Sequence, residues 1–195
     1  MSEIASTTCF DEVSFLGLVP HLPIIIGGTW LLREFLHAVA AEDGGLLSIA
    51  VPFIEEGLAS DTSAWAQMNH SRIDVLIVAK TPEDGSKAWS DLSKFPWRSV
   101  LICHFENLHA KVYAFVSGNH LATCLVGSHN LTTSGIKTNV EAGVLFRSDD
   151  SDSEVFKNVV ACHEYITCLM YRGNVLIDTR PWPAGQLDTI GGKYE

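Results

Sequence analysis

The sequence predicts an α/β fold in which a mixed β-sheet is flanked by helices on both faces. Short apolar runs recur along the chain, stretches with helical spacing separate several of them, and 47% of the residues are hydrophobic. Alternating strands and helices are typical of layered α/β domains. A length of 195 residues suits one domain with a substantial core. No repeat or Pro/Gly-rich linker interrupts it, so we predict a single domain over residues 1–195 with an irregular tail from about residue 179.

In the first half of the chain, helices and strands alternate. Apolar residues from Trp30 to Ala41 recur at helical spacing, which predicts a helix. The apolar run from Leu46 to Phe53 predicts a buried strand that Pro52 ends, because proline cannot donate to a sheet. Similar patterns predict short helices at 63–71 and 86–94, and buried strands at 73–79 and 99–103.

The second half is richer in strands. Strands are predicted at 111–116 and 121–126, and residues 117–120 (SGNH) suit a hairpin turn because Gly and Asn tolerate positive φ. A further strand is predicted at 139–146. The last predicted element is a helix at 153–170, which follows an acidic, serine-containing segment typical of a helix N-cap.

Charge and composition argue against several classes of protein. The 13 basic and 23 acidic residues give a net charge of −10, which does not favour tight non-specific DNA binding. Residues 72–147 nevertheless hold eight basic and six acidic residues, so this segment is the least acidic part. The five cysteines are odd in number and include no CxxC, so we expect neither disulfides, nor a metal site, nor another cofactor.

We expect a cytoplasmic protein with no membrane contact. The start of the chain, from Met1 to Glu12, is acidic and lacks the basic opening of a secretory signal. The apolar run from Leu22 to Leu32 is shorter than the roughly 20 residues that a spanning helix needs.

Three short segments carry the groups most suited to catalysis: His109-Ala110-Lys111, Gly127-Ser128-His129-Asn130 and Asn139-Val140-Glu141. In an extended chain, alternate residues share one face. This alternation would bring His109, Lys111, Ser128, Asn130 and Glu141 into one cleft, and would point His129 away as a structural residue.

These groups suit attack on a phosphodiester. Phosphoryl transfer needs an in-line nucleophile, donors for the charged oxygens and an acid for the leaving group. An unprotonated His109 is a competent nucleophile near neutral pH, and Lys111 with Asn130 can supply charge and hydrogen bonds without a metal. Glu141 could accept the N–H of His109 or pair with Lys111. Ser128 could donate to phosphate or stabilise its own turn.

The order HAK, then GSHN beginning 16 residues after Lys111, then NVE nine residues after Asn130, resembles the HxK…GSxN…E pattern of the phospholipase D superfamily. The flanking text from Leu108 to Phe146 is similar to its nuclease-like branch. The resemblance implies a phospholipase D-like α/β/α sandwich and a metal-independent phosphodiesterase or endonuclease that forms a phosphohistidine. It also implies a nucleic-acid substrate. In one respect the sequence departs from the pattern, because Val116 stands where the family's motif has an aspartate.

The chain holds one HxK…GSxN set, whereas family members with two sets use one histidine as nucleophile and the other as acid. The resemblance therefore implies a homodimer with the active site at the interface. It also suggests the cutting subunit of a defence or restriction system, with a separate recognition or motor subunit supplying specificity. Two alternatives stay open: a weak or inactive phospholipase D-like binding or scaffold module, and a phosphodiesterase acting on lipid.

Overall fold

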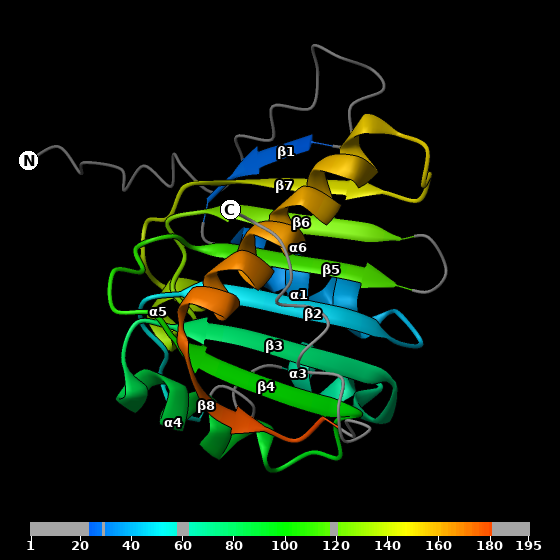
Figure 1. Cartoon of the computed structure of the whole chain (residues 1–195). Helices are drawn as coiled ribbons and strands as arrows, with labels where there is room; N and C mark the ends of the chain where they lie inside the picture. Colours follow the sequence, from blue (N-terminus) through cyan, green and yellow to red (C-terminus); the bar gives the residue numbers. More distant parts are fainter. Residues whose placement is uncertain (1–23, 29, 58–62, 118–120, 181–195) are drawn as a thin grey trace, which may run out of the picture.

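The computed structural model describes residues 24–28, 30–57, 63–117 and 121–180, which form one eight-stranded sheet in the order β1-β7-β6-β5-β2-β3-β4-β8 (Figure 1). Neighbours β2, β3 and β4 are parallel and the other neighbours are antiparallel, so the sheet is mixed. The strands are β1 (Ile24–Gly27), β2 (Gly45–Val51), β3 (Ile73–Ala79), β4 (Ser99–His104), β5 (Val112–Ser117), β6 (Ala122–Gly127), β7 (Gly143–Ser148) and β8 (Asn174–Asp178).

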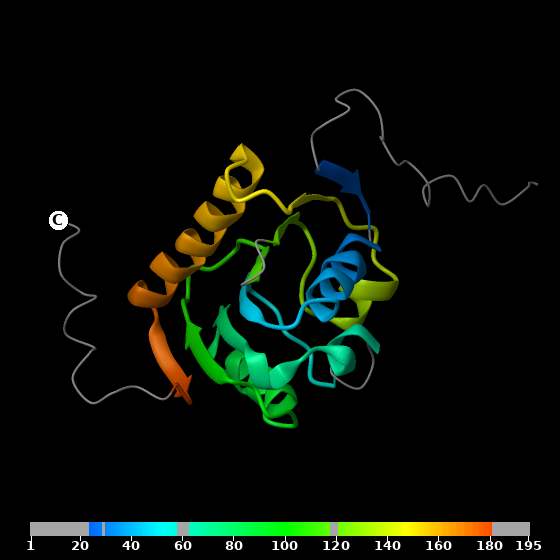
Figure 2. The same ribbon diagram turned by 90° about the vertical axis from the view of Figure 1, so that its right-hand side faces the viewer.

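Helices cover both faces of this sheet, as predicted. The long helix α6 crosses one face, and α1 lies on the other (Figure 2). The short helices pack on the α1 face. The helices are α1 (Trp30–Ala40), α3 (Ser63–Gln67), α4 (Pro82–Leu92), α5 (Thr133–Lys137) and α6 (Glu154–Arg172), with a 3-10 turn η1 (His70–Arg72).

Two apolar clusters fill the spaces between these layers. Successive strand residues point to opposite faces, so a strand covered on both sides is apolar throughout. In β2, Leu47 and Ile49 pack toward α1, and Ala50 packs toward α6. The mainly apolar runs that predicted β2 and β3 thus reflect burial on both faces.

Several element bounds agree closely with the prediction. Strand β3 occupies the predicted residues, and α6 begins where Ser153 accepts a hydrogen bond from the Phe156 N–H at 3.1 Å. Helix α4 begins earlier than predicted, at Pro82. The reason is local: Thr81 accepts a hydrogen bond from the Asp84 N–H at 3.1 Å, and proline is well tolerated in a first turn.

Other predicted elements were wrong in extent. Residues 139–142 are not part of a strand, and β7 begins at Gly143, because the backbone N–H of Asn139 bonds to Ser134 across the end of α5. The predicted helix 63–71 is divided into α3 and η1. Strands β1 and β8 were not predicted. The hairpin turn at 117–120 and the tail beyond residue 180 lie mostly outside the described residues.

Candidate active site

The three polar segments meet where one end of β5, β6 and β7 forms the edge of the sheet that is on the left in Figure 1. Strand β5 begins directly after Lys111, and β6 ends at Gly127 beside the first residue of β7, Gly143. The Gly127 N–H donates to the Lys111 carbonyl at 3.2 Å. Segments 109–111, 127–130 and 139–142 are therefore neighbours, although they are separate in the sequence.

His109 is exposed at this edge, and its ring forms no hydrogen bond with any described residue. Lys111 is half-buried, and its Nζ donates to the carbonyl oxygen of His109 at 3.1 Å. The ammonium group is thereby held close to the histidine. A ring that is accessible and unpaired, beside a fixed cation, is well placed to approach an anionic ligand.

Glu141 connects two of the segments. Its buried carboxylate, only 9% exposed, accepts hydrogen bonds from the Ser128 hydroxyl and from Asn139 Nδ2, the latter at 3.1 Å. Ser128 Oγ in turn accepts from the Ala142 N–H at 3.0 Å. No hydrogen bond joins Glu141 to His109 or Lys111 among the described residues. The carboxylate therefore holds the loop after β6 against the loop before β7.

Asn130 keeps its side-chain amide free of partners within the described ranges, and its Oδ1 is buried. Its backbone oxygen accepts from the Thr132 N–H at 2.9 Å, which fixes the turn. A buried polar atom without a partner costs free energy unless a ligand or water pairs with it. Asn130 thus has unused hydrogen-bonding capacity, as has the buried Nδ1 of His129 in the same segment.

His129 faces inward, as its alternation with Asn130 predicts. It is fully buried, and its Nε2 lies 3.0 Å from the carbonyl of Gly28, which makes this nitrogen the donor. Tyr113 Oη donates to the His129 carbonyl at 3.1 Å. Burial, and secondarily the charge of Glu141, raise the pKa of Tyr113 well above its usual value, so it stays a donor. Sequence reasoning missed Tyr113 and Gly28.

Comparison with known protein families shows which family this chain belongs to. The model of the NgoFVII restriction endonuclease N-terminal phospholipase D domain matches residues 66–170, which include all three polar segments. The chain belongs to this family. The matched family is the phospholipase D domain of a restriction endonuclease, which supports nuclease or phosphodiesterase activity for this chain.

Solved structures show the same fold. NucT from Helicobacter pylori superimposes with a TM-score of 0.55 and 13% identity, covering 78% of this chain and 98% of NucT. Nuc from Salmonella typhimurium, a phospholipase D family member, gives 0.52 and 16% identity, covering 80% of this chain and 97% of Nuc. A comparison with curated proteins finds no match.

The departure at Val116 lies far from the site of this phospholipase D domain. Val116 is five residues beyond Lys111 along β5, a distance of roughly 17 Å at about 3.4 Å per residue. It pairs with Leu46 and Ala122 and packs under α6. Valine at this position therefore leaves the groups around His109 unchanged.

Neither a metal cluster nor a membrane span is seen in the described part of the domain. No three His, Cys, Asp or Glu side chains in residues 24–28, 30–57, 63–117 and 121–180 are grouped as metal ligands. None of the helices in those ranges is both long and apolar enough to cross a bilayer. Cys103 and Cys124 are buried free thiols, and Cys168 is an exposed one.

Proposed function

We propose that the protein is a metal-independent nuclease that hydrolyses DNA or RNA through a phosphohistidine formed on His109. The observation that carries this proposal is the exposed, unpaired ring of His109 beside the Lys111 ammonium, at the edge where Asn130 also lies. Lys111 supplies the positive charge that a metal ion supplies in other phosphodiesterases, and the Asn130 amide adds hydrogen bonds to phosphate oxygens.

In the first step an unprotonated His109 attacks phosphorus. The new P–N bond forms while the bond from phosphorus to the leaving oxygen breaks, and a protonated second histidine gives its proton to that oxygen. Water, deprotonated by the second histidine, then attacks the phosphohistidine and releases the phosphate end. Both histidines return to their starting protonation states.

The second histidine is His109 of another copy of the chain. One polypeptide contains a single HxK…GSxN set, and its buried His129 already donates to the Gly28 carbonyl. A symmetric dimer would place the two copies of His109 face to face across a twofold axis. Sedimentation at micromolar concentration should show the dimer, and a protein that is only monomeric would overturn this part of the proposal.

The family match also supports a biological role for the nuclease as the cutting subunit of a defence or restriction system. The acidic net charge of −10 gives weak affinity for nucleic acid by itself. A separate recognition or motor subunit would therefore deliver the substrate.

Cleavage of labelled DNA and RNA in EDTA tests the proposed chemistry. Activity should persist, and strict dependence on added Mg²⁺ would contradict it. His109→Ala should abolish turnover in a folded dimer, whereas His37→Ala, an exposed histidine on α1, should not. Lys111→Ala should slow turnover on the order of 10²-fold or more.

Mixed dimers test the sharing of the site. A dimer with one intact and one His109→Ala subunit contains a single reactive histidine, so complete two-step turnover should fail. If purified mixed dimers keep about half of the wild-type activity, each subunit works alone and the shared mechanism is wrong.

A further inference from the structure

An aromatic ring and a lysine lie together beside the candidate site and have no role in the chemistry above. Phe53 follows the end of β2 and is 50% exposed. Lys80 follows the end of β3, and its Nζ lies 5.8 Å from the centroid of the Phe53 ring. Lys80 forms no ion pair with any described residue. One face of the molecule thus combines an accessible ring with an uncompensated cation.

The sheet register places this pair at the same end of the sheet as His109. Strands β2 and β5 pair Ala50 with Val112. Phe53 lies three residues after Ala50, just beyond the end of β2, and His109 lies three residues before Val112, just ahead of the antiparallel β5. Both segments therefore leave the sheet at the same end. The parallel pairing of Val51 with Ala79 brings Lys80 to that edge as well.

The chain after Phe53 continues to the GSHN segment. Ile54 forms a parallel bridge with Leu131, and the Glu55 N–H donates to the Leu131 carbonyl at 3.0 Å. Asn130 immediately precedes that residue. The Phe53 ring therefore lies beside Lys80, and the next residue of its chain pairs with the residue that follows Asn130.

The exposed position of the ring is fixed by its neighbours. Ile54 is buried, and its N–H donates to Asp84 Oδ1 at 3.3 Å. Glu55 Oε2 accepts from the Thr133 N–H at 2.6 Å. Since successive extended residues point in opposite directions, an inward Ile54 holds Phe53 outward. A single exposed apolar residue needs no explanation by itself. An exposed ring beside a cation, however, is the combination that binds a base and a phosphate of a nucleotide.

We propose that Phe53 and Lys80 form a nucleotide-binding lip that holds an unpaired base next to the scissile phosphate. The inference rests on the proposed nuclease function and names its substrate class as single-stranded nucleic acid. The ring would stack on one base of any sequence, and the ammonium would contact a neighbouring phosphate. A base inside a duplex already has both faces covered by its neighbours, so a duplex would gain only the phosphate contact.

Binding measurements with an inactive background test this lip. On the His109→Ala background, fluorescence anisotropy would compare a labelled oligothymidylate with an abasic deoxyribose-phosphate strand of equal length. Phe53→Ala should weaken binding of the oligothymidylate about 10-fold or more and that of the abasic strand less than about 2-fold. Phe53→Tyr, which keeps an aromatic face, should retain wild-type affinity.

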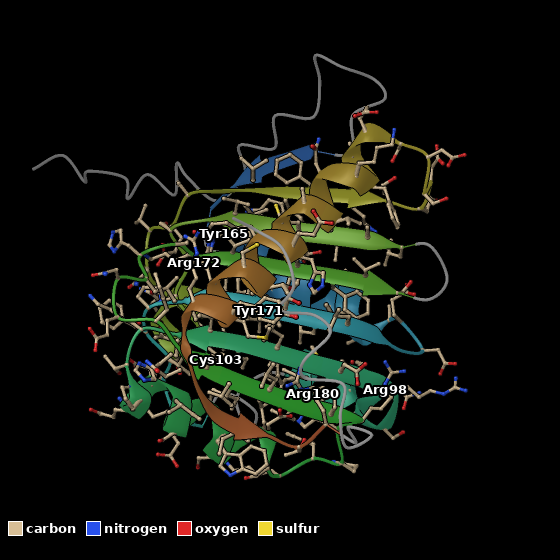
Figure 3. The ribbon with its side chains drawn as sticks, viewed as in Figure 1. Arg98, Cys103, Tyr165, Tyr171, Arg172 and Arg180 are labelled. Carbon is tan, nitrogen blue, oxygen red and sulfur yellow. The ribbon has the colours of Figure 1, made fainter. Side chains whose placement is uncertain are left out.

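The lysine should act differently. Lys80→Ala should weaken binding of both strands and reduce the slope of log K against log salt concentration by about 0.7, the value for one lost contact with a single strand. Two control variants lie on α6, outside the Phe53–Lys80 pair. Tyr165→Ala removes a ring that is 46% exposed on α6 (Figure 3), and Lys157→Ala removes an exposed lysine of the same helix. Neither should change affinity.

The outcomes separate this inference from the function on which it rests. If the wild-type protein cleaves single strands but Phe53→Ala binds oligothymidylate unchanged, or weakens both strands equally, the lip is wrong and the nuclease stands. Preference for an intact duplex over a single strand would also overturn the lip. A wild-type protein that neither binds nor cleaves nucleic acid would overturn both.

Discussion

The Ser128–Glu141 pair gives the sharpest test of how the site is held together. We consider Ser128→Ala, Glu141→Gln and the double variant. Glu141 is buried and accepts two side-chain hydrogen bonds, from Ser128 and Asn139. A hydrogen bond to a charged group contributes about 1.5–3 kcal/mol. In Ser128→Ala the N–H of Ala142 loses its acceptor, the Ser128 hydroxyl. Ala142 is exposed, so water can replace that hydroxyl. Each single variant should therefore cost about 1–2 kcal/mol.

The double variant should cost less than the sum, by about 1 kcal/mol, because both changes remove the same contact. Urea denaturation with an unchanged m-value measures this coupling, and thermal midpoints should fall by roughly 2–4 °C per kcal/mol for a chain of this size. Glu34→Gln, at an exposed position of α1, is the control and should leave stability unchanged. Additive effects within about 0.5 kcal/mol would refute the coupling.

Two further predictions concern residues at the site, and a third concerns His163 on α6. Gly127→Ala should lower the thermal midpoint and activity far more than Gly28→Ala, because its new Cβ would lie 2.5 Å from the backbone oxygen of Ala142, against a nearest atom at 3.3 Å for Gly28. Tyr113→Phe should cost about 1–2 kcal/mol in urea denaturation, since a buried carbonyl of the GSHN segment loses its donor. Burial lowers the pKa of His163 below its ordinary 6.5, so on acidification this histidine is protonated in the unfolded chain before it is protonated in the folded one. Its stability contribution is then present above pH 6.5 and lost as the pH falls through the folded pKa, and His163→Gln should flatten that part of a pH–stability curve.

The fold could be predicted where burial on both faces leaves a continuous apolar run. Strand β3, which is apolar from Val75 to Ala79, is such a case, and its predicted bounds agree with the structure. The edge strands gave no comparable signal. Strand β1 has four residues and ends at Gly27, followed by a second glycine, while β8 has the mixed sequence NVLID and is largely exposed. Short edge strands owe their pairing to the partner strand rather than to their own pattern, so the sequence alone could not predict them.

The site was predictable to a similar, partial degree. Alternation along β5 and β6 correctly brought His109, Lys111 and the GSHN segment to one edge, and correctly turned His129 inward. The strand predicted at 139–142 was wrong, because these residues are a loop that is held by contacts with Ser128 and Ser134. Glu141 nevertheless meets Asn139 and the GSHN segment. Contacts between residues far apart in the chain, such as His129 with Gly28, have no local signal.

The spacing of the motif follows from the geometry of a hairpin. Strands β5 and β6 have six residues each, Val112–Ser117 and Ala122–Gly127, so the chain leaves the edge at Lys111 and returns to it at Gly127. A change in length between Ser117 and Leu121, at the opposite end, would leave that return in place. One residue inserted within β6 would turn every later side chain of the strand to the other face and would exchange the positions of His129 and Asn130. HxK by itself says little, but its distance from GSHN records the length of two paired strands, which explains why the ordered spacing identifies the site better than any one of its residues.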